Sequence, residues 1–128
     1  MLEVFLVHPG GPFWARKDDG AWTIPKGEFE PHEDAFAAAQ REFTEETGSV
    51  ATGEFLHLTP IKQPSGKIVH AWAVAMDCDP TRLKSNTFAF RGREYPEVDR
   101  AAWFTVPDAR RKILKGQLGF LDELDNRL

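Results

Sequence analysis

The chain has 128 residues, of which 41% are hydrophobic and 28% charged, and its formal net charge is -4. This length is typical of one domain, which we expect to span residues 1–128 and to fold without disulfides. The acidic balance disfavours binding to duplex nucleic acid, and no apolar run approaches the roughly 20 residues of a membrane span. The single Cys78 and an N-terminus unlike a signal peptide predict a cytoplasmic protein.

Short apolar stretches bounded by Gly and Pro predict strands along much of the chain. In chain order, these strands cover residues 2–7, 21–24, 55–61, 68–76 and 101–104. The first strand is apolar at nearly every position, which predicts burial of both its faces. The turn sequence Gln63-Pro64-Ser65-Gly66 joins the third and fourth strands.

Two helical regions complete the predicted elements. Residues 31–47 are helix formers, with Pro31 in the first turn, where proline is tolerated, and Gly48 at the position of a left-handed cap. After Pro107, apolar residues recur at helical spacing, with interruptions at two glycines. Strands interleaved with helices predict an α/β sandwich in which helices cover both faces of a mixed sheet.

The helix predicted at residues 31–47 carries a cluster of carboxylates. At about 100° per residue, Glu46 falls between Ala35 and Ala39 at the edge of an apolar stripe, and Glu42 lies one turn earlier. With Glu45, these carboxylates repel one another and lose hydration, so they favour a shared cation. Ligands that are all oxygen suit Mg²⁺, with Mn²⁺ as a substitute, and the small alanines leave room for a metal ion and a ligand. A solvated acidic helix face is the plain alternative.

Negative charge is concentrated in this region. Residues 28–46 contain seven acidic side chains against Arg41 alone, a net charge of -6, so the rest of the chain carries +2 of the total of -4. A bound metal ion would reverse the local sign and let an anionic substrate approach.

The spacing of glycine, glutamate and arginine residues across this region resembles a family signature. The Nudix box has the pattern G-x5-E-x7-R-E-U-x-E-E-x-G, in which U is a bulky apolar residue. The matching residues here are Gly27, Glu33, Arg41, Glu42, Phe43, Glu45, Glu46 and Gly48. The sequence therefore resembles the Nudix hydrolases (MutT-like) closely from Gly27 to Ser49 and more loosely on either side.

This resemblance implies both a fold and an activity. The fold is an α/β/α sandwich, with the helix of the Nudix box on one side of a mixed sheet and the C-terminal helices on the other. The activity is a Mg²⁺-dependent pyrophosphohydrolase, in which metal-activated water attacks a phosphorus of a nucleoside diphosphate derivative. Nucleoside triphosphates or dinucleoside polyphosphates are the expected substrates, and Pro25-Lys26-Gly27 favours the latter. We expect a monomer or a homodimer.

The resemblance also implies roles for the acidic residues. Glu42 and Glu46 match the usual metal ligands, and Glu45 completes the set. The general base is one of these residues or a Glu from a later loop. For that later Glu, which often completes the metal site, Glu97 is the candidate and Glu94 the alternate.

The other implied site residues are basic or structural. Lys26 and Arg41 are candidates to hold phosphate oxygens, together with backbone N–H groups around Gly27. Glu33 and Arg41 brace the loop, and an orienting salt bridge is the favoured interpretation of Arg41. Gly48 closes the box.

Two departures from the family pattern are visible. Ser49 stands where an apolar residue is usual, and family members commonly have a further strand before the first strand predicted here. Two other functions stay open. A nucleotide-sensing module without catalysis is disfavoured by the intact carboxylates, and an interaction domain with an acidic helix predicts no effect of Mg²⁺ on the melting temperature.

Two groups outside the box have alternative interpretations. Phe13 or Trp14 can stack on a base, although burial is the commoner role of large aromatic residues. Arg91 and Arg93 can hold a distal phosphate, but a solvated hairpin tip is the favoured interpretation.

Overall fold

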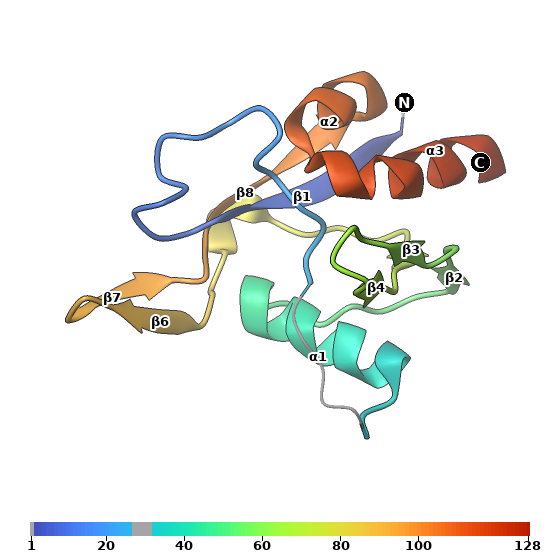
Figure 1. Ribbon diagram of the computed structural model, residues 1–128. Coiled ribbons are helices and arrows are strands. Elements are labelled where there is room, and N and C mark those ends of the chain that lie inside the picture. Colours follow the sequence, from blue (N-terminus) through green and yellow to red (C-terminus); the bar gives the residue numbers. More distant parts are fainter. Residues whose placement is uncertain (1, 27–31) are drawn as a thin grey trace.

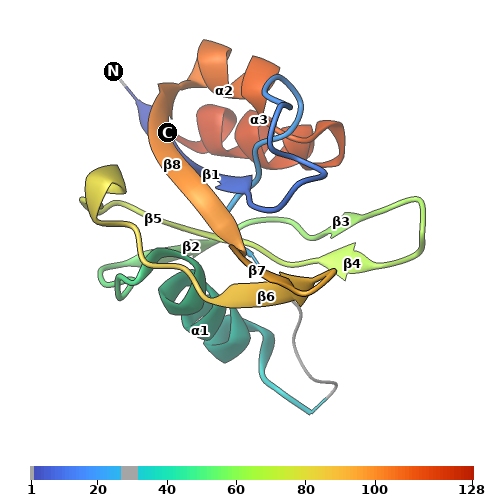
Figure 2. The same ribbon diagram turned by 90° about the vertical axis from the view of Figure 1, so that its left-hand side faces the viewer.

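The computed structural model describes residues 2–26 and 32–128. In chain order, its elements are β1 (Glu3–Pro9), α1 (Ala35–Thr47), β2 (Phe55–His57), β3 (Ile61–Lys62), β4 (Ile68–Val69), β5 (Trp72–Val74), the 3₁₀ turn η1 (Pro80–Arg82), β6 (Thr87–Phe90), β7 (Arg93–Pro96), β8 (Val98–Thr105), α2 (Val106–Lys112), the 3₁₀ turn η2 (Lys115–Gln117) and α3 (Leu118–Arg127). The β1–β8 and β2–β5 pairs lie between α1 on one side and α2 and α3 on the other (Figures 1 and 2). The expected α/β fold with helices on both sides is therefore confirmed.

The strands pair two by two in antiparallel fashion. The pairs are β1–β8, β2–β5, β3–β4 and β6–β7. A mixed sheet also needs parallel pairing, and within the described parts of the chain the only parallel pairing is the isolated bridge between Trp22 and Ile113. None of the helices in those parts is long and apolar enough to cross a bilayer.

Residues 21–24 form isolated bridges, so the short strand predicted there is wrong as an element. Thr23 exchanges both backbone hydrogen bonds with Val7 of β1, at 2.9 Å each. Trp22 turns the other way, donating its N–H to the Lys112 carbonyl at 2.9 Å and accepting the Leu114 N–H at 2.7 Å. The segment divides its hydrogen bonds between two partners and therefore extends neither into a ladder.

The strands predicted at residues 55–61 and 68–76 are each divided in two. Between β2 and β3, Pro60 has no N–H to donate, and the Thr59 N–H donates to Glu123 of α3 at 2.7 Å. The predicted turn before β4 is confirmed, since the Gly66 N–H donates to the Gln63 carbonyl at 2.9 Å. Residues 87–90 were not predicted as a strand. Every residue of β6 is exposed, so its sequence has no buried face to produce an alternating pattern.

Helix α1 begins later than predicted and ends where predicted. The Asp34 carboxylate accepts the Ala37 N–H at 3.0 Å, so this residue is the N-cap and residues 32–34 are not helical. The predicted start at Pro31 lies outside the described residues. At the other end, Gly48 has a φ of 78° and donates its N–H to the Thr44 carbonyl at 2.8 Å, which confirms the left-handed cap.

The main core lies between the β1–β8 pair and the C-terminal helices. Its buried side chains are Leu6, Trp22, Ala109, Ile113 and Leu121. Gln117 of η2 is also buried, and its Oε1 accepts the Ile24 N–H at 3.0 Å. This hydrogen bond fixes the chain just before Pro25 and Lys26, and so positions the segment that enters the Nudix box.

A wide apolar cleft separates β1 from β5. Its volume is about 800 Å³, and side chains of β1, β2, β5, α1 and α3 line it. The backbone groups of Val7 point away from β8, toward Thr23, and strand alternation therefore directs those of Phe5 to the same edge. Among the described residues, β1 has no second strand beside Phe5 and β5 has none besides β2. Two strand edges thus border one cleft.

Candidate active site

The last two turns of α1 hold three carboxylates in three different environments. Glu42 is 9% exposed and lines a cavity beside the helix. Glu45 pairs with Arg41, whose Nη1 donates to the two carboxylate oxygens of Glu45 at 3.2 and 3.1 Å. Glu46 accepts the backbone N–H of Lys26 at 2.8 Å, which ties the helix to the segment preceding the box.

Arg41 joins several carboxylates on the outer side of α1. Its Nε and Nη2 donate to the two carboxylate oxygens of Glu33, at 3.0 and 2.8 Å, and its Nη1 lies 3.0 Å from Glu42 Oε1. The hydrogen bonds that Arg41 donates to Glu33 and Glu45 raise the pKa of its guanidinium above its usual range. A two-pronged pair of this kind fixes orientation as well as charge, and its geometry is that of the bracing salt bridge predicted for Glu33 and Arg41.

Burial and like charge act together on the inner carboxylates. Burial raises the pKa of Glu46 to about 8, and the charges of Glu42 and Glu97 add to the rise against the opposing effect of Lys26. Burial also raises the pKa of Glu42, to which Glu45 and Glu97 contribute. Glu97 follows β7 and is therefore brought near α1 from a distant part of the chain. The carboxylate of Glu94, its alternate, instead accepts the Thr87 hydroxyl at 2.5 Å on the β6–β7 hairpin.

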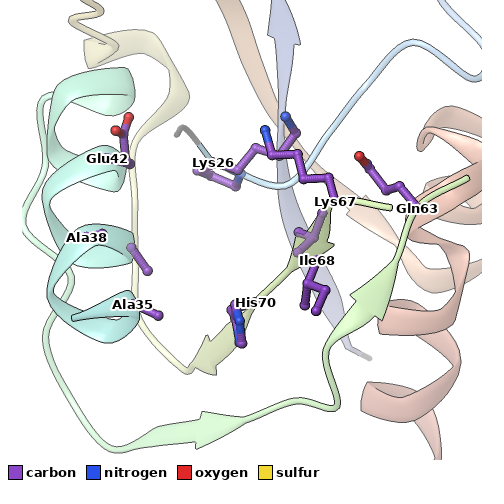
Figure 3. Close-up of a pocket in the computed structure, with 11 residues that line it drawn as sticks. Lys26, Ala35, Ala38, Glu42, Gln63, Lys67, Ile68 and His70 are labelled. Carbon is purple, nitrogen blue, oxygen red and sulfur yellow. The ribbon is translucent and has the colours of Figure 1, made fainter. Parts of the chain in front are cut away.

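A cavity of about 410 Å³ lies beside the carboxylates, between α1 and the β3–β4 pair. Figure 3 shows Ala35, Ala38 and Glu42 on one side, facing Ile68 of β4 and His70, which follows this strand. Lys26 and Lys67 also line it. The predicted stripe of small alanines thus borders open space, and the cavity combines a carboxylate with two cationic side chains.

A family model, the NUDIX domain, matches residues 3–124. The chain belongs to the Nudix family. Among solved structures, it is similar to the solution structure of the E. coli ORF135 protein, with a TM-score of 0.64 and 25% sequence identity. That match covers 97% of this chain and 80% of the other. Membership makes this Nudix protein a hydrolase that acts on pyrophosphate bonds of small molecules, in a family whose members generally use divalent metal cations.

The donor chemistry of this Nudix site fits a divalent cation. Glu42 and Glu46 offer carboxylate oxygens, which are the ligands that hard divalent cations prefer. Burial raises the pKa values of both side chains, and a bound cation would stabilise their ionised forms. In the described part of the chain, no three His, Cys, Asp or Glu side chains form a group that could hold a metal ion in this arrangement. Glu45 is engaged by Arg41 instead, and its role as a ligand stays a prediction.

The structure brings most of the predicted site residues together and adds others. Lys26 lies at the cavity, whereas Gly27 lies outside the described residues and its phosphate contact stays a prediction. Gln63, Lys67 and His70 line the cavity but were not predicted as site residues. The turn that contains Gln63 was visible in the sequence, but the direction in which it folds was not, because that depends on packing against α1.

Proposed function

We propose that this Nudix protein is a Mg²⁺-dependent pyrophosphohydrolase that cleaves the diphosphate linkage of a nucleoside triphosphate or a dinucleoside polyphosphate. The observation that carries the proposal is the placement of buried Glu42 at a cavity and of Glu46 against the backbone N–H of Lys26, which it accepts at 2.8 Å. The lining of that cavity also includes Lys26 and Lys67. Carboxylates for a cation and ammonium groups for phosphates therefore share one site.

Each residue has a role in this proposal. Glu42, Glu46 and Glu97 would hold the metal ion, with Glu45 as the further candidate, and Mn²⁺ would substitute for Mg²⁺. When bound, the metal polarises phosphoryl oxygens and lowers the pKa of a coordinated water. A carboxylate of this set accepts the proton of the attacking water, and Lys26 offsets the charge on the departing phosphate.

Arg41 has two parts in the proposed reaction. Its ion pairs with Glu33, just before α1, and with Glu45, near the end of α1, hold these segments together, so that Glu42 and Glu46 keep a constant orientation. Three of its donors are occupied by these carboxylates in the structure. We therefore assign Arg41 mainly to positioning, with contact to a phosphate oxygen as its second role.

A substrate panel tests the proposal. Purified protein would be incubated with Mg²⁺ and ATP, diadenosine tetraphosphate, a nucleotide sugar or ADP-ribose in ¹⁸O-labelled water. We expect cleavage of the first or second substrate, with the label showing which phosphorus is attacked. The Glu46→Gln variant should lose at least about 100-fold in kcat/KM, whereas the control Glu54→Gln, exposed and remote from the cavity, should not. Survival of every substrate, with equal Mg²⁺ binding by wild type and Glu46→Gln, would contradict the proposal.

A nucleotide-sensing module is the second candidate. Two observations favour it. Glu45 forms an ion pair with Arg41, and among the described residues no three His, Cys, Asp or Glu side chains are grouped so that they could hold a metal ion. Such a module would be stabilised thermally by nucleotides without turning them over. A melting temperature that neither Mg²⁺ nor a nucleotide changes would instead favour a plain interaction domain with an acidic helix.

A further inference from the structure

Two segments that are distant in the sequence meet beside the carboxylates. The Gly10 N–H donates to the Glu97 carbonyl at 2.9 Å, which joins the loop after β1 to the end of β7. The ring of Phe88 lies so close to Gly11 that a Cβ on the glycine would be 2.7 Å from it. The loop after β1 and the β6–β7 hairpin therefore form one continuous surface.

The hairpin contributes exposed aromatic rings to this surface. Phe88 lies opposite Tyr95, and Phe90 opposite Arg93, so these four side chains share one face of the hairpin. The exposed fraction is 36% for Phe88 and 46% for Phe90, although aromatic residues usually contribute to a core. Gly11 covers part of the Phe88 ring, and the remaining surface of both rings is exposed.

The loop contributes a further ring, and cations accompany the rings. Phe13 is 69% exposed and packs edge-on against Trp14 with ring centroids 5.1 Å apart. The Nζ of Lys17 lies 3.9 Å from the centroid of the Phe13 ring. The Arg91 guanidinium lies 5.4 Å from the Phe90 ring. We call Phe13, Phe88, Phe90, Arg91 and Arg93 the aromatic–cationic face.

This face begins at the proposed catalytic carboxylates. The Asn86 N–H donates to the Glu45 carbonyl at 3.0 Å just before β6, and Glu97 follows β7, so both ends of the hairpin are fixed next to α1. The hairpin extends about 13 Å along its four-residue strands. In Figure 1, the hairpin lies beyond the left-hand end of α1 and the β3–β4 pair lies above its right-hand part. The carboxylates thus adjoin the cavity through Glu42 and the base of the hairpin through Glu45 and Glu97.

We propose that the aromatic–cationic face binds a second nucleotide of the substrate, which makes dinucleoside polyphosphates, rather than nucleoside triphosphates, the preferred substrate class. This inference rests on the proposed function. Exposed rings provide stacking partners for a base of any identity, and the adjacent guanidinium groups neutralise phosphates. An apolar partner would leave the arginines without an anion, and a simple anion would leave the rings exposed to water. A nucleotide provides a base that stacks on the rings and phosphates that pair with the arginines.

Substrate preference tests the inference. We would measure kcat/KM for diadenosine tetraphosphate and for ATP in wild type, Phe90→Ala, Arg93→Gln and Phe13→Ala. The ratio of the two values should favour the dinucleotide in wild type and fall about tenfold in each variant, as expected for the loss of one stacking or phosphate contact. The matched controls are Val50→Ala and Arg82→Gln, exposed residues outside the face, which should keep the wild-type ratio. Phe13 lies outside the hairpin, so its variant remains informative if the hairpin variants fail to fold.

Binding without turnover separates this inference from the proposed function. In EDTA, diadenosine tetraphosphate should quench the fluorescence of Trp14 more strongly than ATP, and the Trp14→Phe variant should lose the difference. Hydrolysis with an unchanged ratio in all three variants would overturn the inference and leave the proposed function standing. Quenching that depends on Phe90, in a protein that hydrolyses neither compound, would overturn the proposed function and leave the binding face.

Discussion

Glu42, Glu45 and Glu46 are close together near the end of α1, and yet their environments differ. Helical periodicity predicts that they are neighbours and that Arg41 of the same helix can reach Glu45. It does not predict that Glu46 accepts the backbone N–H of Lys26 or that Glu42 faces the cavity. The electrostatics of a single carboxylate therefore depends on segments that the helix pattern does not describe.

Glu46 should make the metal-free protein less stable as the pH rises. Its pKa is about 8 in the folded chain against 4.5 for an unperturbed carboxyl, so between these values the folded state binds more protons and stability falls with increasing pH. Glu46→Gln removes this titration. In EDTA, we expect the variant to melt above wild type at pH 8 and to approach it near pH 4. Mg²⁺ at pH 8 should raise the melting temperature of wild type more than that of the variant. A difference that does not vary with pH would contradict this prediction.

Asp18 should show the opposite dependence. Its carboxylate accepts hydrogen bonds from Lys112 Nζ and from Trp22 Nε1, and these lower its pKa below the usual 3.8. The folded state therefore binds fewer protons, so the stabilisation is complete above pH 3.8 and is lost as the pH falls through the lowered pKa. Asp18→Asn should lower the melting temperature slightly at pH 7, because the pair is exposed, and leave it unchanged near pH 2. An equal loss at both pH values would show that charge is not the cause.

Elements whose ends are marked by local residues agree best with the sequence predictions. Gly48 ends α1 as predicted, because a left-handed cap needs only the right residue at the right place. The predicted strand at residues 21–24 and the missed strand β6 both depend on pairing. Residues 21–24 form only isolated bridges, because they divide their hydrogen bonds between two partners, and β6 has no buried face. Local pattern therefore predicts helix ends better than strand partners.

Gly48→Ala should destabilise the protein by about 1–2 kcal/mol. The residue has a φ of 78°, and an added Cβ would lie 2.8 Å from Lys84 Cβ. Gly20→Ala is the matched control, since its φ is 74° but nothing lies within 4 Å of the added Cβ. Urea denaturation should show a larger loss of unfolding free energy for Gly48→Ala than for Gly20→Ala. Equal losses would mean that backbone conformation alone accounts for both and that the contact with Lys84 contributes nothing.

At the scale of the whole molecule, the two helical layers enclose strand pairs that are incompletely joined. The apolar cleft between β1 and β5 has a volume of about 800 Å³ and includes Phe36, Phe55 and Trp72 in its lining. Its lining is mostly apolar, and exposed apolar surface of this kind is uncommon in monomeric proteins. The active site lies at the edge of this assembly, and not in its best-packed part around Leu6 and Ile113.

The cleft predicts that the native protein binds the dye 8-anilinonaphthalene-1-sulfonate (ANS). Fluorescence of the dye should increase with the folded protein in buffer and should be lost in concentrated urea. Retained near-ultraviolet circular dichroism would distinguish a cleft in a packed protein from a molten globule, which also binds such dyes. No increase in dye fluorescence with the folded protein would show that the cleft is closed in solution.

The α/β class could be predicted from strands and helices that alternate along the sequence. The family and the helix that carries the carboxylates could be predicted from spacings within 22 residues, from Gly27 to Gly48, where periodicity and caps act locally. The tertiary structure decided the partners: Glu97 beside Glu46, Lys67 and His70 at the cavity, and Phe88 against Gly11. The physical reason is that these contacts join segments whose relative position depends on strand pairing and core packing, and neither leaves a periodic signal in the residues that finally meet.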